Sequence, residues 1–181
     1  MIPHSLIIDE FLPDFDDFRN WADRQIYAPV INPADGVEYP GICSHVPTYG
    51  TRLRLEAIMQ HPVKINAAFM RLSLAGVHVP HQAHHDGLMG QYSMMLYLNR
   101  AKHCQGGTSL VRHVSGDDLA HWETDHSKPE MWCAYSLCEM APNRAFIFRA
   151  DLMHRAEPVG GFGKGALNGR LVYVCFFDLE M

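Results

Sequence analysis

Two side chains in the segment 81–99 could together bind a metal ion. His84 and Asp86 are two residues apart, so at a strand end both side chains leave the same face. One offers an imidazole nitrogen and the other a carboxylate oxygen. A third ligand from another strand would complete a set of two histidines and one carboxylate, the usual geometry of non-haem iron(II) oxygenases. His154, at the start of a later strand-like run, could supply it.

The pair alone is a weak signal, because the chain contains 12 histidines in 181 residues. His81 and His85 lie close enough in sequence to replace His84 as the ligand. A similar pair, His121 and Glu123, falls in a polar stretch, and we rank it below the first pair. The metal hypothesis therefore depends on the elements that bring His84, Asp86 and His154 together.

Composition indicates one globular domain with an ordinary core. Hydrophobic residues make up 48% of the chain and charged residues 19%. The net charge of -5 disfavours binding to a nucleic-acid backbone. Five cysteines without a CxxC pair argue against a disulfide framework and a structural zinc site. The sequence shows no signal-peptide pattern and no apolar run of membrane-spanning length, so we expect a soluble, cytoplasmic protein with no membrane partner.

The N-terminal part, residues 1–66, is expected to contain a strand, two helices and a loop. The strand is predicted at 4–11. Asp14 is a candidate N-cap for a helix in which Phe15, Phe18, Ala22 and Ile26 follow at helical spacing. Pro, Gly and Asn in 28–49 indicate a long loop, and a second helix is predicted at 53–60.

Residues 67–178 are predicted to form the core of the single domain 1–181. Short strands punctuated by Gly, Asn, Asp and Pro are expected at 67–74, 77–84, 92–98, 108–113, 145–149, 154–159 and 171–177. We interpret 116–142 as a helical or irregular insertion, and the glycine-rich segment 160–169 as a flexible hairpin at the rim of the site. Together these elements predict a mainly β (α+β) fold, a double-stranded β-helix (jelly-roll, cupin-like) core with N-terminal helices packed on one sheet.

The order of these motifs resembles the prolyl 4-hydroxylase-like branch of the iron(II)- and 2-oxoglutarate-dependent oxygenases. The resemblance covers most of the chain, from about Ser5 to Asp178, and is weakest at 28–65 and 116–142. The matching elements are His84-His85-Asp86, Tyr97-Leu98-Asn99, Gly106-Gly107-Thr108, Ala145-Phe146-Ile147-Phe148, His154, Arg170 and Phe176-Phe177-Asp178.

The resemblance implies Fe(II) held by His84, Asp86 and His154, with 2-oxoglutarate as co-substrate and ascorbate as a candidate stimulant. It places Arg170 on the far carboxylate of 2-oxoglutarate, which a guanidinium fork matches in shape. It also places the Tyr97 hydroxyl there, unless a register shift of one residue puts Tyr92 in its place.

The reaction that the resemblance implies is hydroxylation of a C–H bond with release of succinate and CO2. Asp86 favours hydroxylation, because family members that halogenate lack this carboxylate. The substrate class is a peptidyl or amino-acid-like small molecule, and the oligomeric state is left open. The alternatives are a cupin-like metal-binding protein without 2-oxoglutarate and a non-catalytic barrel that binds a partner. The 28–49 loop and the 116–142 insertion are where specificity would be encoded.

Overall fold

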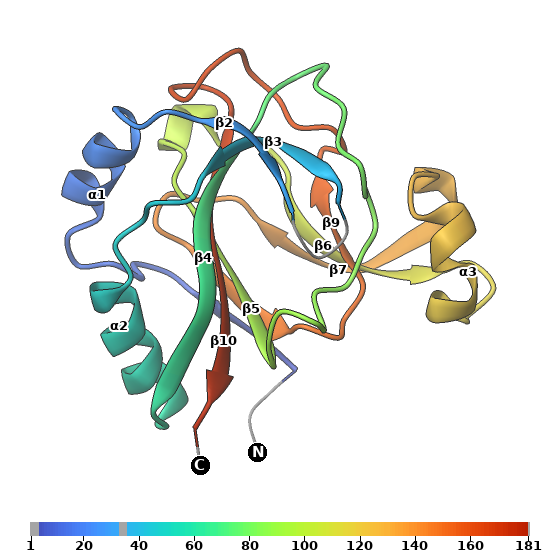
Figure 1. The fold of residues 1–181 in the computed structure, drawn as a ribbon, viewed down its shortest axis with the longest axis horizontal. Coiled ribbons are helices and arrows are strands. Elements are labelled where there is room, and N and C mark those ends of the chain that lie inside the picture. The colour runs from blue at the N-terminus through green and yellow to red at the C-terminus, as the bar shows by residue number, and fades with distance from the viewer. Residues whose placement is uncertain (1–3, 33–35, 181) are drawn as a thin grey trace.

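A computed structural model of the chain describes residues 4–32 and 36–180 (Figure 1). The strands are β1 (Ser5–Ile8), β2 (Ala28–Ile31), β3 (Glu38–Cys43), β4 (Val63–Ser73), β5 (Tyr92–Tyr97), β6 (Gly107–His113), β7 (Trp132–Glu139), β8 (Ala145–Arg149), β9 (His154–Glu157) and β10 (Arg170–Leu179). The helices are α1 (Phe15–Ala22), α2 (Tyr49–Met59) and α3 (Asp118–Asp125), with 3-10 turns at Ala101–His103 and Pro129–Met131.

The strands form two antiparallel sheets. The larger sheet has the order β1-β8-β5-β10-β4-β3-β2, and the smaller sheet has the order β7-β6-β9. Helices α1 and α2 lie together on the outer side of the larger sheet, whereas α3 projects from the opposite end of the molecule, beside β6 and β7 (Figure 1). Two sheets with helices on one of them match the predicted jelly roll, so the fold class is confirmed.

Strand β10 is the centre of the larger sheet and is buried on both of its faces. It pairs with β4 on one side and β5 on the other. Its odd-numbered residues from Leu171 to Phe177 pack with α1 and α2, and its residues Val172, Val174 and Phe176 pack in a second cluster with Leu110 of β6. Because side chains alternate along a strand, the one unbroken apolar run serves two cores. Arg170, at the start of β10, belongs to the face between the sheets.

The Gly106-Gly107 pair marks a close approach of three strand ends. A Cβ on Gly106 would lie 2.1 Å from the carbonyl oxygen of Glu157, and one on Gly107 would lie 1.9 Å from that of Cys138. Gly106 also has a φ of 58°, which favours glycine. Any residue with a Cβ is therefore excluded at these two positions, where β6 enters between β7 and β9.

Most predicted strands are present with shifted ends. The segments 4–11, 67–74, 92–98, 108–113, 145–149, 154–159 and 171–177 correspond to β1, β4, β5, β6, β8, β9 and β10. The predicted helices also form, but α1 ends at Ala22, and Ile26 is 84% exposed rather than part of its apolar face.

Four predictions of local structure are wrong. Residues 77–84 form no strand; they are irregular with bends, and only His84 makes an isolated bridge. Within the predicted 28–49 loop, β2 and β3 extend the larger sheet, and Pro29 is tolerated because β2 is the edge strand and needs fewer hydrogen bonds. Residues 33–35 of that loop lie outside the described residues.

The other two errors concern connections between the sheets. The predicted insertion 116–142 contains β7, a strand of the smaller sheet whose exposed polar residues hid it from the apolar pattern. Residues 160–169 are not a hairpin, because β9 and β10 belong to different sheets and this segment crosses between them. None of the described helices is long and apolar enough to cross a membrane.

Candidate metal centre

The backbone brings the two histidines of the predicted set directly opposite each other. His84 donates its N–H to the His154 carbonyl at 3.0 Å, and His154 donates to the His84 carbonyl at 2.8 Å. Residues paired in this way in an antiparallel bridge direct their side chains to the same side. Asp86 is fixed by its own N–H, which donates to the carbonyl of Ala150 at 2.7 Å.

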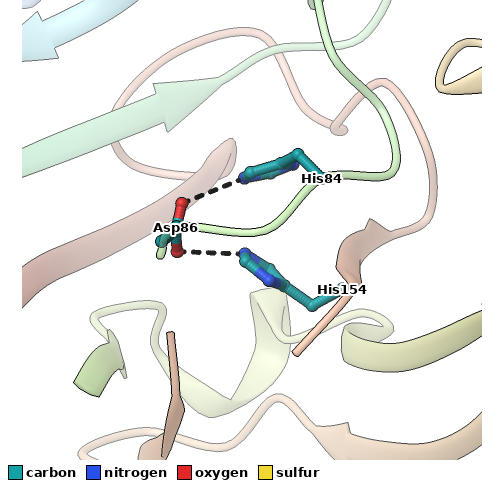
Figure 2. Close-up of side chains that lie close together, drawn as sticks. All are labelled: His84, Asp86 and His154. Atoms are coloured by element: carbon teal, nitrogen blue, oxygen red, sulfur yellow. Dashed lines mark ion pairs between the residues drawn. The ribbon is translucent and has the colours of Figure 1, made fainter. Parts of the chain in front are cut away.

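The three side chains converge on one point (Figure 2). Nε2 of His84 lies 3.6 Å from Oδ1 of Asp86, and Nε2 of His154 lies 3.3 Å from Oδ2. One ligand atom from each residue lies within 4.8 Å of the others. Two imidazole nitrogens and one carboxylate arranged in this way are a donor set for a divalent transition metal such as iron(II).

The hydrogen bonds leave the metal-facing nitrogen of His154 free to coordinate. Nδ1 of His154 lies 3.0 Å from the Leu152 carbonyl. Since a carbonyl only accepts, Nδ1 carries the proton and Nε2 has its lone pair exposed toward Asp86. That Nε2 atom is buried and has no hydrogen-bond partner among the described residues, a cost that a metal ion would remove.

His84 is also held in the neutral form that a metal requires. Burial and the neighbouring His154 lower its pKa to about 3, while Asp86 opposes the shift. Asp86 accepts a hydrogen bond from the Ser93 hydroxyl at 2.9 Å on Oδ2. Ser93 is fully buried on β5, so it orients the carboxylate from a rigid strand.

Residues from the 116–142 segment hold the backbone just before His84. Ala83 donates its N–H to the His126 carbonyl at 2.9 Å, and its own carbonyl accepts from Nε1 of Trp122 at 2.8 Å. Ala83 is 1% exposed and packs with Trp132 and Met153. The segment around α3 therefore supports the stretch from His84 to Asp86, the metal-binding arm. Its sequence did not reveal this role.

A cavity beside His84 contains two arginines. Its lining includes Arg71, Ser73, His81, His84 and Arg170. Arg170 donates from Nη2 to the Gly107 carbonyl at 3.1 Å and to the Thr108 hydroxyl at 3.2 Å. Burial lowers the pKa of Arg170 to about 10, so it keeps its charge at neutral pH.

Tyr97 reaches the same polar group as Arg170. Its hydroxyl lies 3.0 Å from Oγ1 of Thr108 and 3.1 Å from the Cys138 carbonyl. Burial raises its pKa, so the phenol stays protonated. Tyr92 instead stacks on Phe177, with ring centroids 5.4 Å apart, in the core under the helices. The predicted alternation along β5 is confirmed.

The neighbouring histidines do not join the ligand set. Nδ1 of His85 accepts the N–H of Gly87 at 3.2 Å in a local turn, and the ring of His81 lies 4.9 Å from that of His126. Sequence reasoning missed Ser93 and Arg71 as site residues. The signal for Ser93 was present, because alternation along the strand puts it on the face of Tyr97.

His121 belongs to a second cluster, but its partner is not Glu123. His113, His121 and Asp125 offer ligand atoms within 4.8 Å of one another. Here Asp125 already binds Lys128 at 2.7 Å and Nε2 of His113 at 3.1 Å. A protein cation therefore already neutralises this carboxylate, and we interpret the cluster as structural.

Comparison with known proteins supports the fold without a family match in sequence. No protein-family model and no curated protein matches the chain. Among solved structures it is similar to the viral collagen prolyl hydroxylase vCPH from Paramecium Bursaria Chlorella virus-1, with a TM-score of 0.56, 11% identity and coverage of 99% of this chain and 91% of that chain. It is also similar to EctD from S. alaskensis with bound Fe, with a TM-score of 0.55, 14% identity and coverage of 97% and 73%.

A third similar structure is the epimerase SnoN in complex with Fe3+, alpha ketoglutarate and nogalamycin RO. Its TM-score is 0.56 at 10% identity, and the alignment covers 96% of this chain and 78% of that chain. At this level of identity the likeness establishes the fold. The fold expected from the resemblance to prolyl hydroxylase-like oxygenases is therefore confirmed.

Proposed function

We propose that the protein is an iron(II)- and 2-oxoglutarate-dependent oxygenase that hydroxylates a C–H bond of a peptidyl or amino-acid-like small molecule. The observation that carries the proposal is the convergence of His84, Asp86 and His154 on one point inside the jelly roll, with the buried Arg170 in the adjoining cavity. Structures of the same fold contain Fe in one case and Fe3+ with alpha ketoglutarate in another.

The donor set fits iron(II) in charge and in protonation. Two neutral imidazoles and one carboxylate place one negative charge against a divalent ion. The orphaned Nε2 of His154 faces the same point as Asp86. Iron(II), 2-oxoglutarate and dioxygen together supply the oxidising power for hydroxylation, with release of succinate and CO2.

The chain's own residues bind and orient. Ser93 fixes the Asp86 carboxylate, and the Leu152 carbonyl fixes the His154 tautomer. Arg170, which lines the cavity, and Tyr97 both form a hydrogen bond with Thr108. They would bind the far carboxylate of 2-oxoglutarate. The site lies between two sheets, which limits access of water to the reacting groups.

The first test asks whether iron(II) binds at the proposed site or at other histidines of the chain. We expect His154→Ala to abolish iron(II) binding in an anaerobic titration, because it removes one of the three ligands. His78→Ala, at an exposed histidine outside the site, is the matched control and should bind one iron per chain as the wild type does. Equal iron binding by the two variants would refute the proposed site.

The second test separates an oxygenase from a cupin-like metal protein. We expect Arg170→Gln to weaken 2-oxoglutarate binding by about 10- to 100-fold, the value of a charged hydrogen bond, with iron binding retained. Arg112→Gln, at an exposed arginine of β6, is the control. Unchanged 2-oxoglutarate affinity in Arg170→Gln, or no succinate formed by the wild type, would favour the alternatives.

A further inference from the structure

The cavity beside the metal centre holds one more cation than 2-oxoglutarate requires. Arg71 pairs with Val172 of β10, which in turn pairs with Tyr97 of β5. Residues opposite one another in a sheet share a face, and Val172 and Tyr97 belong to the cluster between the sheets. Ser73, two residues further along β4, pairs with Arg170. Both arginines therefore enter the same interior space.

One nitrogen of the Arg71 guanidinium is buried and has no hydrogen-bond partner among the described residues. This nitrogen is the Nη2 atom, which is inaccessible to solvent. The guanidinium carbon lies 5.6 Å from the ring centroid of Tyr39, which stabilises the charge only modestly. A buried guanidinium nitrogen without an acceptor is costly, and an anion bound in the cavity would supply that acceptor.

Arg71 lines the same cavity as His84 of the metal centre. Burial lowers the pKa of Arg71, whereas Tyr39 and then Asp86 raise it. Asp86 has another task, because both of its oxygens face the two histidines. Asp86 is therefore directed at the two histidines, and among the described residues it forms no ion pair with Arg71.

The chemistry of 2-oxoglutarate leaves this arginine for a second ligand. If 2-oxoglutarate binds the metal through one of its two carboxylates, its other carboxylate is left for a cation of the chain. Arg170, held against Thr108 and Gly107, accounts for that group. A guanidinium fork matches a carboxylate in two parallel hydrogen bonds.

We infer that Arg71 is the receptor for a free carboxylate of the substrate, so that the enzyme acts on a small organic acid such as a free amino acid. The inference rests on the proposed function and narrows it. An internal peptide residue has no free α-carboxylate to pair with the unpartnered Nη2 of Arg71.

The test compares acids with their amides on the full chain loaded with Mn(II) and 2-oxoglutarate, so that binding is measured without turnover. The probes are the proteinogenic L-amino acids and their carboxamides. Binding is screened by thermal shift, and the affinities are then measured by calorimetry. We expect at least one free acid to bind the wild type about 10- to 100-fold more tightly than its amide. Arg71→Gln should remove that preference while 2-oxoglutarate affinity stays within about twofold. Arg71→Lys should restore part of it.

Arg112→Gln is the matched control, because Arg112 also lies over a tyrosine, 4.8 Å from the Tyr135 ring centroid, but on the exposed surface. It should keep the full preference for the acid. Two results would overturn the inference. One is a panel in which no acid binds more tightly than its amide. The other is an Arg71→Gln variant that loses 2-oxoglutarate as severely as Arg170→Gln, which would assign both arginines to the co-substrate.

Failure of the proposed function gives a different result. If wild-type enzyme with iron(II) forms no succinate yet distinguishes acid from amide, the oxygenase proposal fails and the carboxylate receptor remains. If succinate formation responds equally to acid and amide, the receptor fails and the oxygenase remains.

Discussion

Removing one indole hydrogen bond should weaken the metal centre without changing any ligand. In Trp122→Phe the ring still packs, but the Ala83 carbonyl loses the donor that lies 2.8 Å away. Ala83 is 1% exposed, and leaving a buried carbonyl unpaired costs about 1 to 3 kcal/mol. Trp122 itself is half-buried, so water can reach part of the gap, and we expect the lower part of that range.

The cost should appear at the metal because Ala83 immediately precedes His84. Metal binding needs the arm from His84 to Asp86 to be ordered, so a looser arm lowers the affinity. A penalty of about 1.4 kcal/mol corresponds to a tenfold loss. We therefore expect Trp122→Phe to bind iron(II) about tenfold more weakly and to lower the free energy of unfolding of the metal-free protein by about 1 kcal/mol.

Trp132→Phe provides the matched control. Its Nε1 also donates to a backbone carbonyl at 2.8 Å, that of Asp125, within the same segment, so its loss leaves the hydrogen bonds of Ala83 in place. Anaerobic iron(II) titration and urea unfolding of both variants give the comparison. Trp132→Phe should lose stability and keep its iron affinity. The reasoning is refuted if the two variants lose affinity equally, or if Trp122→Phe binds iron within twofold of the wild type.

Three further predictions concern the same scaffold. Ser93→Ala removes the hydrogen bond to Asp86 and should lower iron affinity about tenfold; an unchanged titration curve would contradict it. Asn143→Ala removes two hydrogen bonds to the backbone of Leu12, both of 2.8 Å, and should cost about 3 kcal/mol in urea unfolding, with iron affinity intact. Iron(II) at 100 times its dissociation constant should stabilise the wild type by about 2.7 kcal/mol, whereas His154→Ala should show no such gain.

Local patterns in the sequence were sufficient for the strands that form the core. The run from Leu171 to Phe177 is apolar throughout because β10 is buried on both faces, and this signal does not depend on its partners. The edge strands were missed for the opposite reason. β2 contains Pro29, and the side chains of β2 are exposed along its length, so only pairing with a neighbouring strand identifies it.

Spacing and type of residue identified His84, Asp86 and His154 as candidates. For His84 and Asp86, a separation of two positions on an extended segment is enough to put both side chains on one face. What spacing could not decide is which histidine of His81, His84 and His85 would face inward. That choice depends on the backbone bridge between His84 and His154, a contact between residues 70 positions apart.

The tertiary structure alone decided the surroundings of the site. Arg71 looked like an ordinary strand arginine, and it became a candidate receptor because β4 pairs with β10 in a register that turns it inward beside Arg170. Trp122 acquired a role because α3 folds back against Ala83. Charge burial and long-range hydrogen bonds depend on which distant segments meet. The sequence by itself therefore determined the ligand types and the strand pattern, and the pairing of strands determined what surrounds them.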